Sequence, residues 1–301
     1  MASPPVVLAA IAQATERIKL TSAVTVLSTA DPVKVFEDFT AVDLISQGRA
    51  EITAGRGAYT ESFPLFGKEL SDYDELFEEN LGLLESLNAD ATVTWTGKHR
   101  GPLDRVEVYP RPVHGRIPVW IAVGGTPSSV VRAGRLGLPV YFAILGQPER
   151  FAPLAELYRQ AGADAGHRTD GGPGSLRSGV TSHFFAASSS QEARDTFYPY
   201  YANYIGNNMP GGRSGTLSRA AFEAWAEPHG ALMVGSPAEI VEKILWEREI
   251  LGHDRFLAQI GLGGLPFAET AGSIELLATE ILPAVNAAIG TDERQTQGVS
   301  A

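Results

Sequence analysis

Segments with the patterns of β-strands and α-helices alternate along the whole chain, and this order limits the folds it can adopt. Six apolar runs rich in β-branched residues are typical of buried strands, and amphipathic segments separate them. The predicted strands are residues 19–27, 49–54, 117–123, 138–145, 178–187 and 255–260. Such alternation predicts an α/β protein with a parallel sheet and helical crossovers, either a barrel or a doubly wound open sheet.

Capping residues mark the expected helices. Asp31 followed by Pro32 is an N-cap followed by proline at the first helical position, and the run from Ser236 to Glu239 has capping-box spacing. Further helices are expected at residues 4–14, 72–87, 126–137, 148–161 and 268–287. No compositional break or internal repeat divides the chain, so we predict one domain over residues 1–290 and a polar tail over 291–301.

Charge and composition exclude several classes of protein. The 301 residues carry 24 Lys and Arg against 35 Asp and Glu, a net charge of -11, which disfavours binding to nucleic acid or to anionic membranes. The absence of cysteine excludes a disulfide scaffold and a cysteine nucleophile. We expect no apolar stretch long enough to cross a bilayer and no signal peptide, and therefore a cytoplasmic protein.

Several cofactor and catalytic motifs are missing. The chain has no G-x-G-x-x-G after a strand, no phosphate-binding G-x-x-x-x-G-K-[ST], no H-E-x-x-H and no G-x-S-x-G. None of the six histidines lies three or four residues from another, so no metal site is predicted, and most of the histidines are expected on the surface or in loops.

Two glycine-rich segments that follow predicted strands could bind an anion. In the first, Gly55 and Gly57 flank Arg56, whose guanidinium can bind a phosphate with two parallel hydrogen bonds; the alternative is a tight turn with a solvated arginine. In the second, Gly124, Gly125, Thr126, Ser128 and Ser129 lead into a helix, where free N–H groups and hydroxyls favour an anion; the alternative is an ordinary capped turn. In a barrel both segments would lie at the carboxyl face, where active sites occur.

Small and aromatic residues suggest room for a flat ring on the same face. Ser22 and Ala23 would let a ring lie against the backbone, and the glycine run 261–264 would keep the face open. The aromatic residues that could wall such a pocket are Tyr59, Phe63, Phe66, Tyr141 and Phe142, with ordinary core packing as the alternative.

These residues belong to segments that resemble the bacterial luciferase family of flavin-dependent oxidoreductases. The resemblance is carried by TSAVTVLSTADPVKVFEDFTAVDLISQGRAEITAGRGAYTESFPLFG, PVWIAVGGTPSSVVRAGRLGLP, SPAEIVEKILWEREILGHDRF and QIGLGGLPF, in this order. It implies a (β/α)8 TIM-barrel fold, reduced FMN or a deazaflavin as cofactor, a small-molecule substrate, a separate flavin reductase and a homodimer.

The resemblance also implies roles for individual residues. A cis peptide that supports the flavin ring is expected between Ala23 and Val24, and Arg56 matches the arginine that holds the flavin phosphate. The hydroxyl- and amide-bearing phosphate loop matches Gly124, Gly125, Thr126, Ser128 and Ser129. Tyr59 matches a residue near the flavin, and Gly55 adjoins this site.

The chain departs from the family pattern at two places. Asp74 stands where some relatives have a second phosphate-binding arginine, and a carboxylate cannot bind phosphate. The first strand, helix and second strand of the family, with the catalytic histidine that follows them, have no counterpart, so about six of eight barrel strands are expected. We interpret this as a start located further upstream or a truncation, and we assign no catalytic residue.

Four functions fit the sequence to different degrees. The first is a monooxygenase that uses reduced FMN and oxygen on a small organic substrate, and the second is hydride transfer with a deazaflavin. The third is a flavin-binding protein without turnover. The fourth, a phosphosugar enzyme, is disfavoured because the phosphate sites of many such barrels follow the last two strands.

Overall fold

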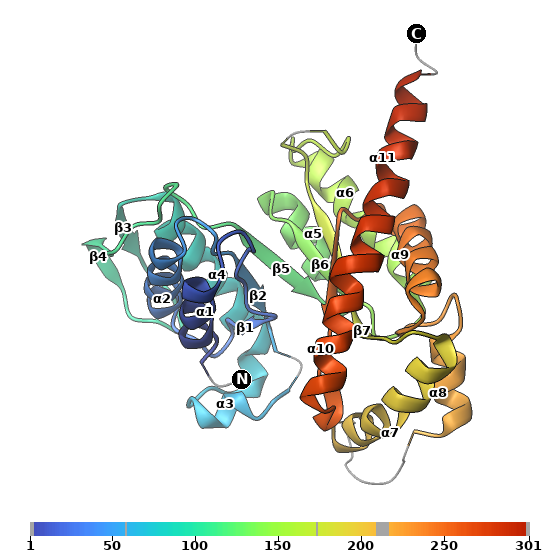
Figure 1. Ribbon diagram of the computed structural model, residues 1–301. Coiled ribbons are helices and arrows are strands. Elements are labelled where there is room, and N and C mark those ends of the chain that lie inside the picture. Colours follow the sequence, from blue (N-terminus) through green and yellow to red (C-terminus); the bar gives the residue numbers. More distant parts are fainter. Residues whose placement is uncertain (1–2, 58, 173, 209–216, 299–301) are drawn as a thin grey trace. The chain divides into compact units, whose positions relative to one another are not determined.

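The computed structural model describes residues 3–57, 59–172, 174–208 and 217–298. The chain divides into two compact units, and each is described by itself. The first comprises residues 1–123 with 138–140, and the second comprises residues 124–137 with 141–301 (Figure 1).

Three parallel strands form the sheet of the first unit. They are β1 (Thr25–Val26), β2 (Ile52–Gly55) and β5 (Val119–Val123), with β2 in the middle. The strand predicted at residues 19–27 is shorter than expected. It pairs with its neighbour at Leu20 and again at β1, and between them the chain turns, with the hydroxyls of Ser22 and Thr25 hydrogen-bonded at 2.7 Å.

Among the helices of the first unit, α2 (Pro32–Ile45) begins at the capping residue that the sequence indicated. The others are α1 (Pro4–Ala14), the short α3 (Ser62–Leu65) and η1 (Leu70–Asp72), and α4 (Tyr73–Ala89). The Asp31 side chain accepts a hydrogen bond from the backbone of Val33 at 2.9 Å, which satisfies a donor at the start of α2. Phe36 and Phe39 of α2 are fully buried, as the helical spacing of its apolar residues predicted.

An antiparallel hairpin follows α4. Its strands are β3 (Thr92–Trp95) and β4 (Leu103–Glu107), which pair with a register shift between Val93 and Trp95. The Glu79 carboxylate of α4 accepts hydrogen bonds from the backbone N–H groups of three hairpin residues, Lys98, His99 and Arg100. The hairpin is therefore tied to α4 by charge-assisted hydrogen bonds.

In the second unit, β7 (Ser178–Ala186) is the longest strand. Its first half pairs in parallel with β9 (Arg255–Gln259), and its last three residues pair in parallel with β8 (Met233–Gly235). On the other side it neighbours β6 (Val140–Ala143), which continues into a hydrogen bond from Ile144 N to Thr181 O. The sequence predicted all of these strands except β8.

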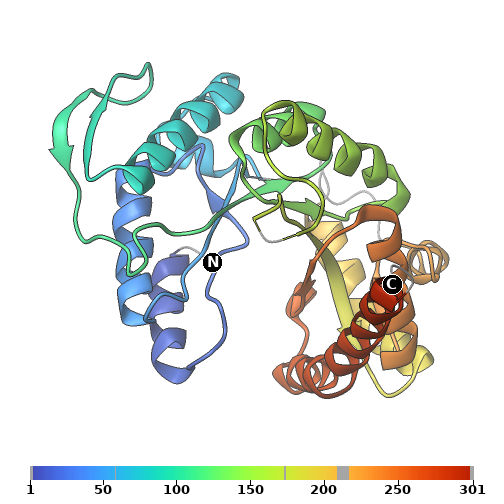
Figure 2. The same cartoon turned by 90° about the horizontal axis from the view of Figure 1, so that it is seen from above.

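Long helices accompany the strands of the second unit (Figure 2). They are α5 (Pro127–Leu136), η2 (Pro148–Phe151), α6 (Ala152–Asp164), α7 (Ser190–Asn208), α8 (Arg219–Ala226) and α9 (Pro237–Leu251). Gly134 lets α5 pack closely on α6, because a Cβ there would lie 2.6 Å from the Tyr158 carbonyl oxygen.

A nearly continuous helix ends the described chain. It consists of α10 (Phe267–Leu276), one π-helical turn η4 (Leu277–Ile281) and α11 (Leu282–Gly298), and Ile281 and Val285 pack against α9. The segment Phe267–Gly290 is long and apolar enough to cross a membrane, with a mean hydropathy of 1.2 and 17% of it buried. The prediction that no stretch meets this criterion was wrong, although a single such helix is weak evidence for a membrane span.

Candidate functional site

The predicted ring-binding residues of the first unit lie together. The Ala23–Val24 peptide is cis, as expected. The parallel register sets Val26 opposite Gly55, and a Cβ at Gly55 would lie 2.7 Å from a methyl carbon of Val24. Only glycine therefore fits at position 55 without displacing Val24. Val24, directly before β1, therefore lies against Gly55, the last residue of β2.

Arg56 follows directly at the carboxyl end of β2, where its guanidinium contacts the start of α4. It forms an ion pair with Asp74 at 2.5 Å and lies 5.1 Å from the centre of the Tyr73 ring. The Tyr73 hydroxyl in turn donates to the carbonyl oxygen of Gly57 at 2.8 Å. The side chain of Arg56 is 18% exposed and that of Asp74 is 68% exposed, so the pair faces solvent on the Asp74 side. The alternative of a merely solvated arginine is thereby excluded.

The aromatic residues expected around a ring do not form one wall. Phe63, Tyr141 and Phe142 are buried core residues, and Phe63 stacks on Tyr73 with ring centres 5.5 Å apart. Phe66 and Tyr59 are instead exposed, at 62% and 48%. Core packing, the alternative considered from the sequence, therefore applies to three of the five.

In the second unit, the segment from Gly124 to Ser129 has the features of an anion-binding loop. Gly124 and Gly125 are exposed, a Cβ added at either would meet no atom within 4 Å, and Gly125 has a φ of +121°, which favours glycine. Thr126 is the N-cap of α5, yet its side chain makes no capping hydrogen bond. The Ser129 hydroxyl is buried without a hydrogen-bond partner among the described residues. A helix start that follows exposed glycine backbone fits a phosphate group.

The glycine run after β9 has a packing role that the sequence did not reveal. It forms the 3₁₀ turn η3 (Leu262–Gly264) against α7, and a Cβ at Gly263 would lie 1.8 Å from the carbonyl oxygen of Tyr200. Asn203 of α7 also donates to the Gly263 carbonyl at 3.3 Å. The expectation that this run keeps the face open was therefore wrong, because α7 packs directly on it.

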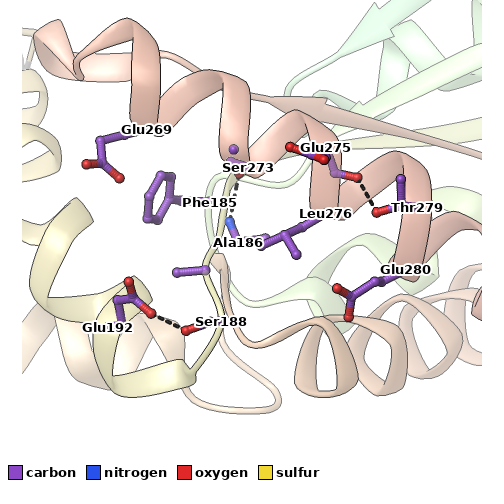
Figure 3. A pocket seen from close by; sticks show the side chains of 12 residues that line it. Phe185, Ala186, Ser188, Glu192, Glu269, Ser273, Glu275, Leu276, Thr279 and Glu280 are labelled. Carbon is purple, nitrogen blue, oxygen red and sulfur yellow. Dashed lines mark hydrogen bonds between the residues drawn. The ribbon is translucent and has the colours of Figure 1, made fainter.

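A pocket of about 320 Å³ lies in the second unit beside the end of β7 (Figure 3). Residues 185–188 line one side, and α10 and η4 line the other, where the Ser273 hydroxyl accepts a hydrogen bond from Ala186 N at 2.9 Å. Its acidic lining residues are Glu192, Glu269, Glu275 and Glu280. Four carboxylates repel a phosphate, so this pocket does not suit a nucleotide-like cofactor.

Two of the six histidines are buried, whereas the other four are half-buried or exposed. His183 on β7 is 5% exposed and His253 before β9 is 3% exposed. Burial lowers the pKa of each imidazole to about 4, so both rings are neutral at pH 7. His183 Nδ1 lies 2.8 Å from the Tyr201 hydroxyl oxygen of α7. The apolar pattern of residues 178–187 was the signal that could have indicated the burial of His183.

No group of three or more His, Asp or Glu side chains with metal-binding geometry occurs in the part of the chain that the structure describes. For an anionic cofactor group, the first unit offers the guanidinium of Arg56, and the second unit offers the backbone and hydroxyl groups at the start of α5.

Parallel strands with helical crossovers, and a glycine-rich loop between a strand and a helix, are the elements of an α/β protein of the (β/α)8 barrel type. The profile of the family described as luciferase-like monooxygenase matches residues 1–254, and the chain belongs to this family. The resemblance noted in the sequence is thereby confirmed.

Individual relatives agree with this family. The alkanal monooxygenase alpha chain of Photorhabdus laumondii is 29% identical over 208 residues, which cover 68% of this chain and 57% of that protein. The chain spans about half the length of the alkanal monooxygenase alpha chains it matches.

Solved structures show the same fold. The monooxygenase RslO1 from Streptomyces bottropensis is 26% identical with a TM-score of 0.79, covering 93% of this chain and 82% of that one. The oxygenating constituent of 3,6-diketocamphane monooxygenase from Pseudomonas putida, in complex with FMN, is 19% identical with a TM-score of 0.72, covering 93% and 83%. The F420-dependent tetrahydromethanopterin reductase from Methanopyrus kandleri is 18% identical with a TM-score of 0.71, covering 93% and 87%.

Proposed function

We propose that this chain binds reduced FMN and, with oxygen, oxygenates a small organic substrate. The observation that carries the proposal is the exposed backbone of Gly124 and Gly125 before the start of α5, in a chain that belongs to a family of monooxygenases. When bound, the flavin supplies the redox chemistry. The protein contributes binding, orientation and exclusion of water.

We assign the phosphate of the cofactor to two sets of groups. In the first unit, Arg56 would donate charge-assisted hydrogen bonds to a phosphate. In the second unit, the backbone N–H groups and hydroxyls of Gly125, Thr126, Ser128 and Ser129 would do so. The backbone at Ala23, Val24 and Gly55, together with Tyr59, would contact the flavin ring. The absence of a side chain at Gly55 makes room for the Val24 side chain, so Val24 packs directly against the backbone at the end of β2.

Paired titrations with FMN and riboflavin test the phosphate assignment. Arg56→Ala should weaken FMN by at least tenfold, the loss of one charge-assisted contact of about 1.5–3 kcal/mol, and should leave riboflavin within twofold. Quenching of flavin fluorescence gives both dissociation constants. Equal losses for the two ligands would show that Arg56 does not bind the phosphate.

The oxygenase activity has its own test. Reduced FMN, supplied by a separate flavin reductase or prepared chemically, is mixed with the chain and oxygen. A bound flavin species that outlives the one in buffer supports a monooxygenase, whereas flavin binding with an unchanged oxidation rate would indicate a protein without turnover. An F420-dependent hydride transfer is the second candidate, because structures with similar TM-scores include an F420-dependent reductase.

A homodimer and a cytoplasmic location are parts of the same proposal. The first unit leaves apolar side chains exposed on adjacent helices, with Val6 of α1 at 70%, Leu44 of α2 at 45% and Ile45 at 43%. Burial of such a face in a partner would be favourable. Sedimentation of the wild type and of Val6→Glu/Leu44→Glu tests the dimer, and a monomeric wild type would exclude it. Cell fractionation tests the location, which a supply of reduced flavin requires to be cytoplasmic.

A further inference from the structure

His183 lies level with the carboxyl ends of β6 and β9, three residues before the end of β7. In the β7–β9 register it is opposite Gln259, the last residue of β9. Phe184 and Ala186 pack against the crossover helix α9 and the terminal helix, while His183 and Phe185 point to the opposite face, toward α7. In a barrel-type fold the face away from the crossover helices is the interior, and its carboxyl edge is where active sites occur.

The contact with Tyr201 determines which ring nitrogen of His183 carries the proton. Tyr201 is 3% exposed, and within the described residues its hydroxyl has His183 Nδ1 as its one hydrogen-bond partner. A buried hydroxyl that only accepted from Nδ1 would leave its own proton unsatisfied. The Tyr201 hydroxyl therefore donates to Nδ1, and the neutral imidazole carries its proton on Nε2. Burial also raises the pKa of Tyr201, which keeps the phenol protonated for this role.

The Nε2–H group has no hydrogen-bond acceptor among the residues that the structure describes, although the side chain is 95% buried. The surroundings are aromatic. The rings of Tyr201 and Tyr204 meet the imidazole edge to face, each with centres 5.4 Å away. Ligand sites are mostly apolar, and a few hydrogen-bond donors or acceptors in their walls orient the bound molecule. The Nε2–H group among aromatic rings has this arrangement.

No other histidine combines these features. His99 and His167 hydrogen-bond to Glu75 and to the Arg135 carbonyl, and His229 stacks on Trp246. His114 lies against Gly48, away from any strand end. His253 is as buried as His183, and its Nδ1 atom has no hydrogen-bond partner within the described ranges. It precedes β9, however, and therefore lies at the amino end of that strand.

We propose that His183 contacts the ligand and donates a hydrogen bond from Nε2 to a carbonyl oxygen of an uncharged molecule. The inference rests on the proposed function, and the carbonyl belongs to the organic substrate or to the flavin ring. Tyr201 is the positioning residue that holds the imidazole in the donating tautomer. A neutral imidazole in an apolar wall selects against a carboxylate at this point, because the aromatic surroundings do not replace the hydration that a carboxylate would lose.

Nitrogen-15 spectra of histidine-labelled protein test the tautomer and the contact directly. The expected result is that the His183 proton resides on Nε2 in the wild type and that this preference weakens in Tyr201→Phe. Cyclohexanone and oxidised FMN are added separately as probes, with cyclohexane as the matched molecule without oxygen. A shift of Nε2 with cyclohexanone assigns the contact to the substrate, and a shift with FMN assigns it to the flavin. A proton on Nδ1, or no Nε2 shift with either carbonyl probe, would overturn the proposal.

Amide variants separate the two ring nitrogens. His183→Asn keeps a polar group near the Nδ1 position but loses the Nε2 donor, and it should weaken the ligand that shifts Nε2 by at least tenfold. His183→Gln reaches the Nε2 position and should recover most of that affinity. His253→Asn is the matched control and should change affinity less than twofold, whatever its effect on stability. Equal losses in both His183 variants would indicate a structural role and refute the contact. Failure of FMN to bind wild-type protein would refute the proposed function alone, since the tautomer and the cyclohexanone shift are measured without flavin.

Discussion

Removing the charge of Asp74 should strengthen the binding of FMN. Asp74 forms an ion pair with Arg56 at 2.5 Å, so the proposed phosphate ligand is partly neutralised. In Asp74→Asn the guanidinium keeps its contact with the Tyr73 ring, 5.1 Å from the ring centre, but loses the competing carboxylate. If Asp74 were instead needed to hold Arg56 in place, Asp74→Asn would weaken the binding of FMN.

The magnitude follows from Coulomb's law. A phosphate bound to the guanidinium on the side away from Asp74 would lie roughly 6 Å from the Asp74 carboxylate, where two unit charges in water repel by about 0.7 kcal/mol. Because Asp74 is 68% exposed, the high dielectric applies, and a phosphate with a charge of about -1.5 to -2 gives roughly 1–1.4 kcal/mol. The expected gain in FMN affinity is about five- to tenfold at low salt, and less at physiological ionic strength because of screening.

Fluorescence titration of FMN and riboflavin at low and at physiological salt measures this effect. Riboflavin has no phosphate and should change less than twofold. Glu75→Gln is a matched control, since Glu75 neighbours Asp74 on α4 but pairs with Lys98 at 2.5 Å and not with Arg56. Unchanged or weaker FMN binding in Asp74→Asn, or an equal gain for riboflavin, would refute the assignment of Arg56 to the phosphate.

Three further predictions concern the second unit. Gly125→Ala should weaken FMN severalfold while the chain still folds, because its φ of +121° disfavours alanine but nothing lies near the added methyl group; titration and thermal unfolding separate these effects. Gly263→Ala should instead destabilise the unit by more than about 2 kcal/mol, because the methyl group would lie 1.8 Å from the Tyr200 carbonyl oxygen; an unchanged melting temperature would contradict this packing. Glu247 is fully buried, and burial raises the pKa of its carboxyl group to about 8. Between about pH 4.5 and 8 the folded state therefore binds one more proton than the unfolded state, and the free energy of unfolding falls as the pH rises through that range. Urea unfolding at several pH values should therefore show that the stability of Glu247→Gln, relative to that of the wild type, rises from pH 5 to 8. A stability difference that does not change with pH would argue against a protonated Glu247.

Much of the fold could be predicted from local patterns. Asp31 caps α2 because its carboxylate and the proline after it act within one turn, and the six predicted strands form because their apolar residues are contiguous. The segment 233–235 was missed as a strand, since three residues carry too little periodicity to be distinguished from a loop. It pairs only because the last residues of β7 offer it a partner.

The sequence by itself determined the alternation of strands and helices, the family and the glycine-rich segments, because each depends on residues close together in the chain. Tertiary structure alone decided which groups meet. Arg56 is paired with Asp74 from 18 residues away, the Gly263 backbone is covered by α7, and the His183 imidazole is oriented by Tyr201. Burial and hydrogen-bond partners arise when distant segments pack, and these set the charge, the tautomer and the accessibility of each functional group.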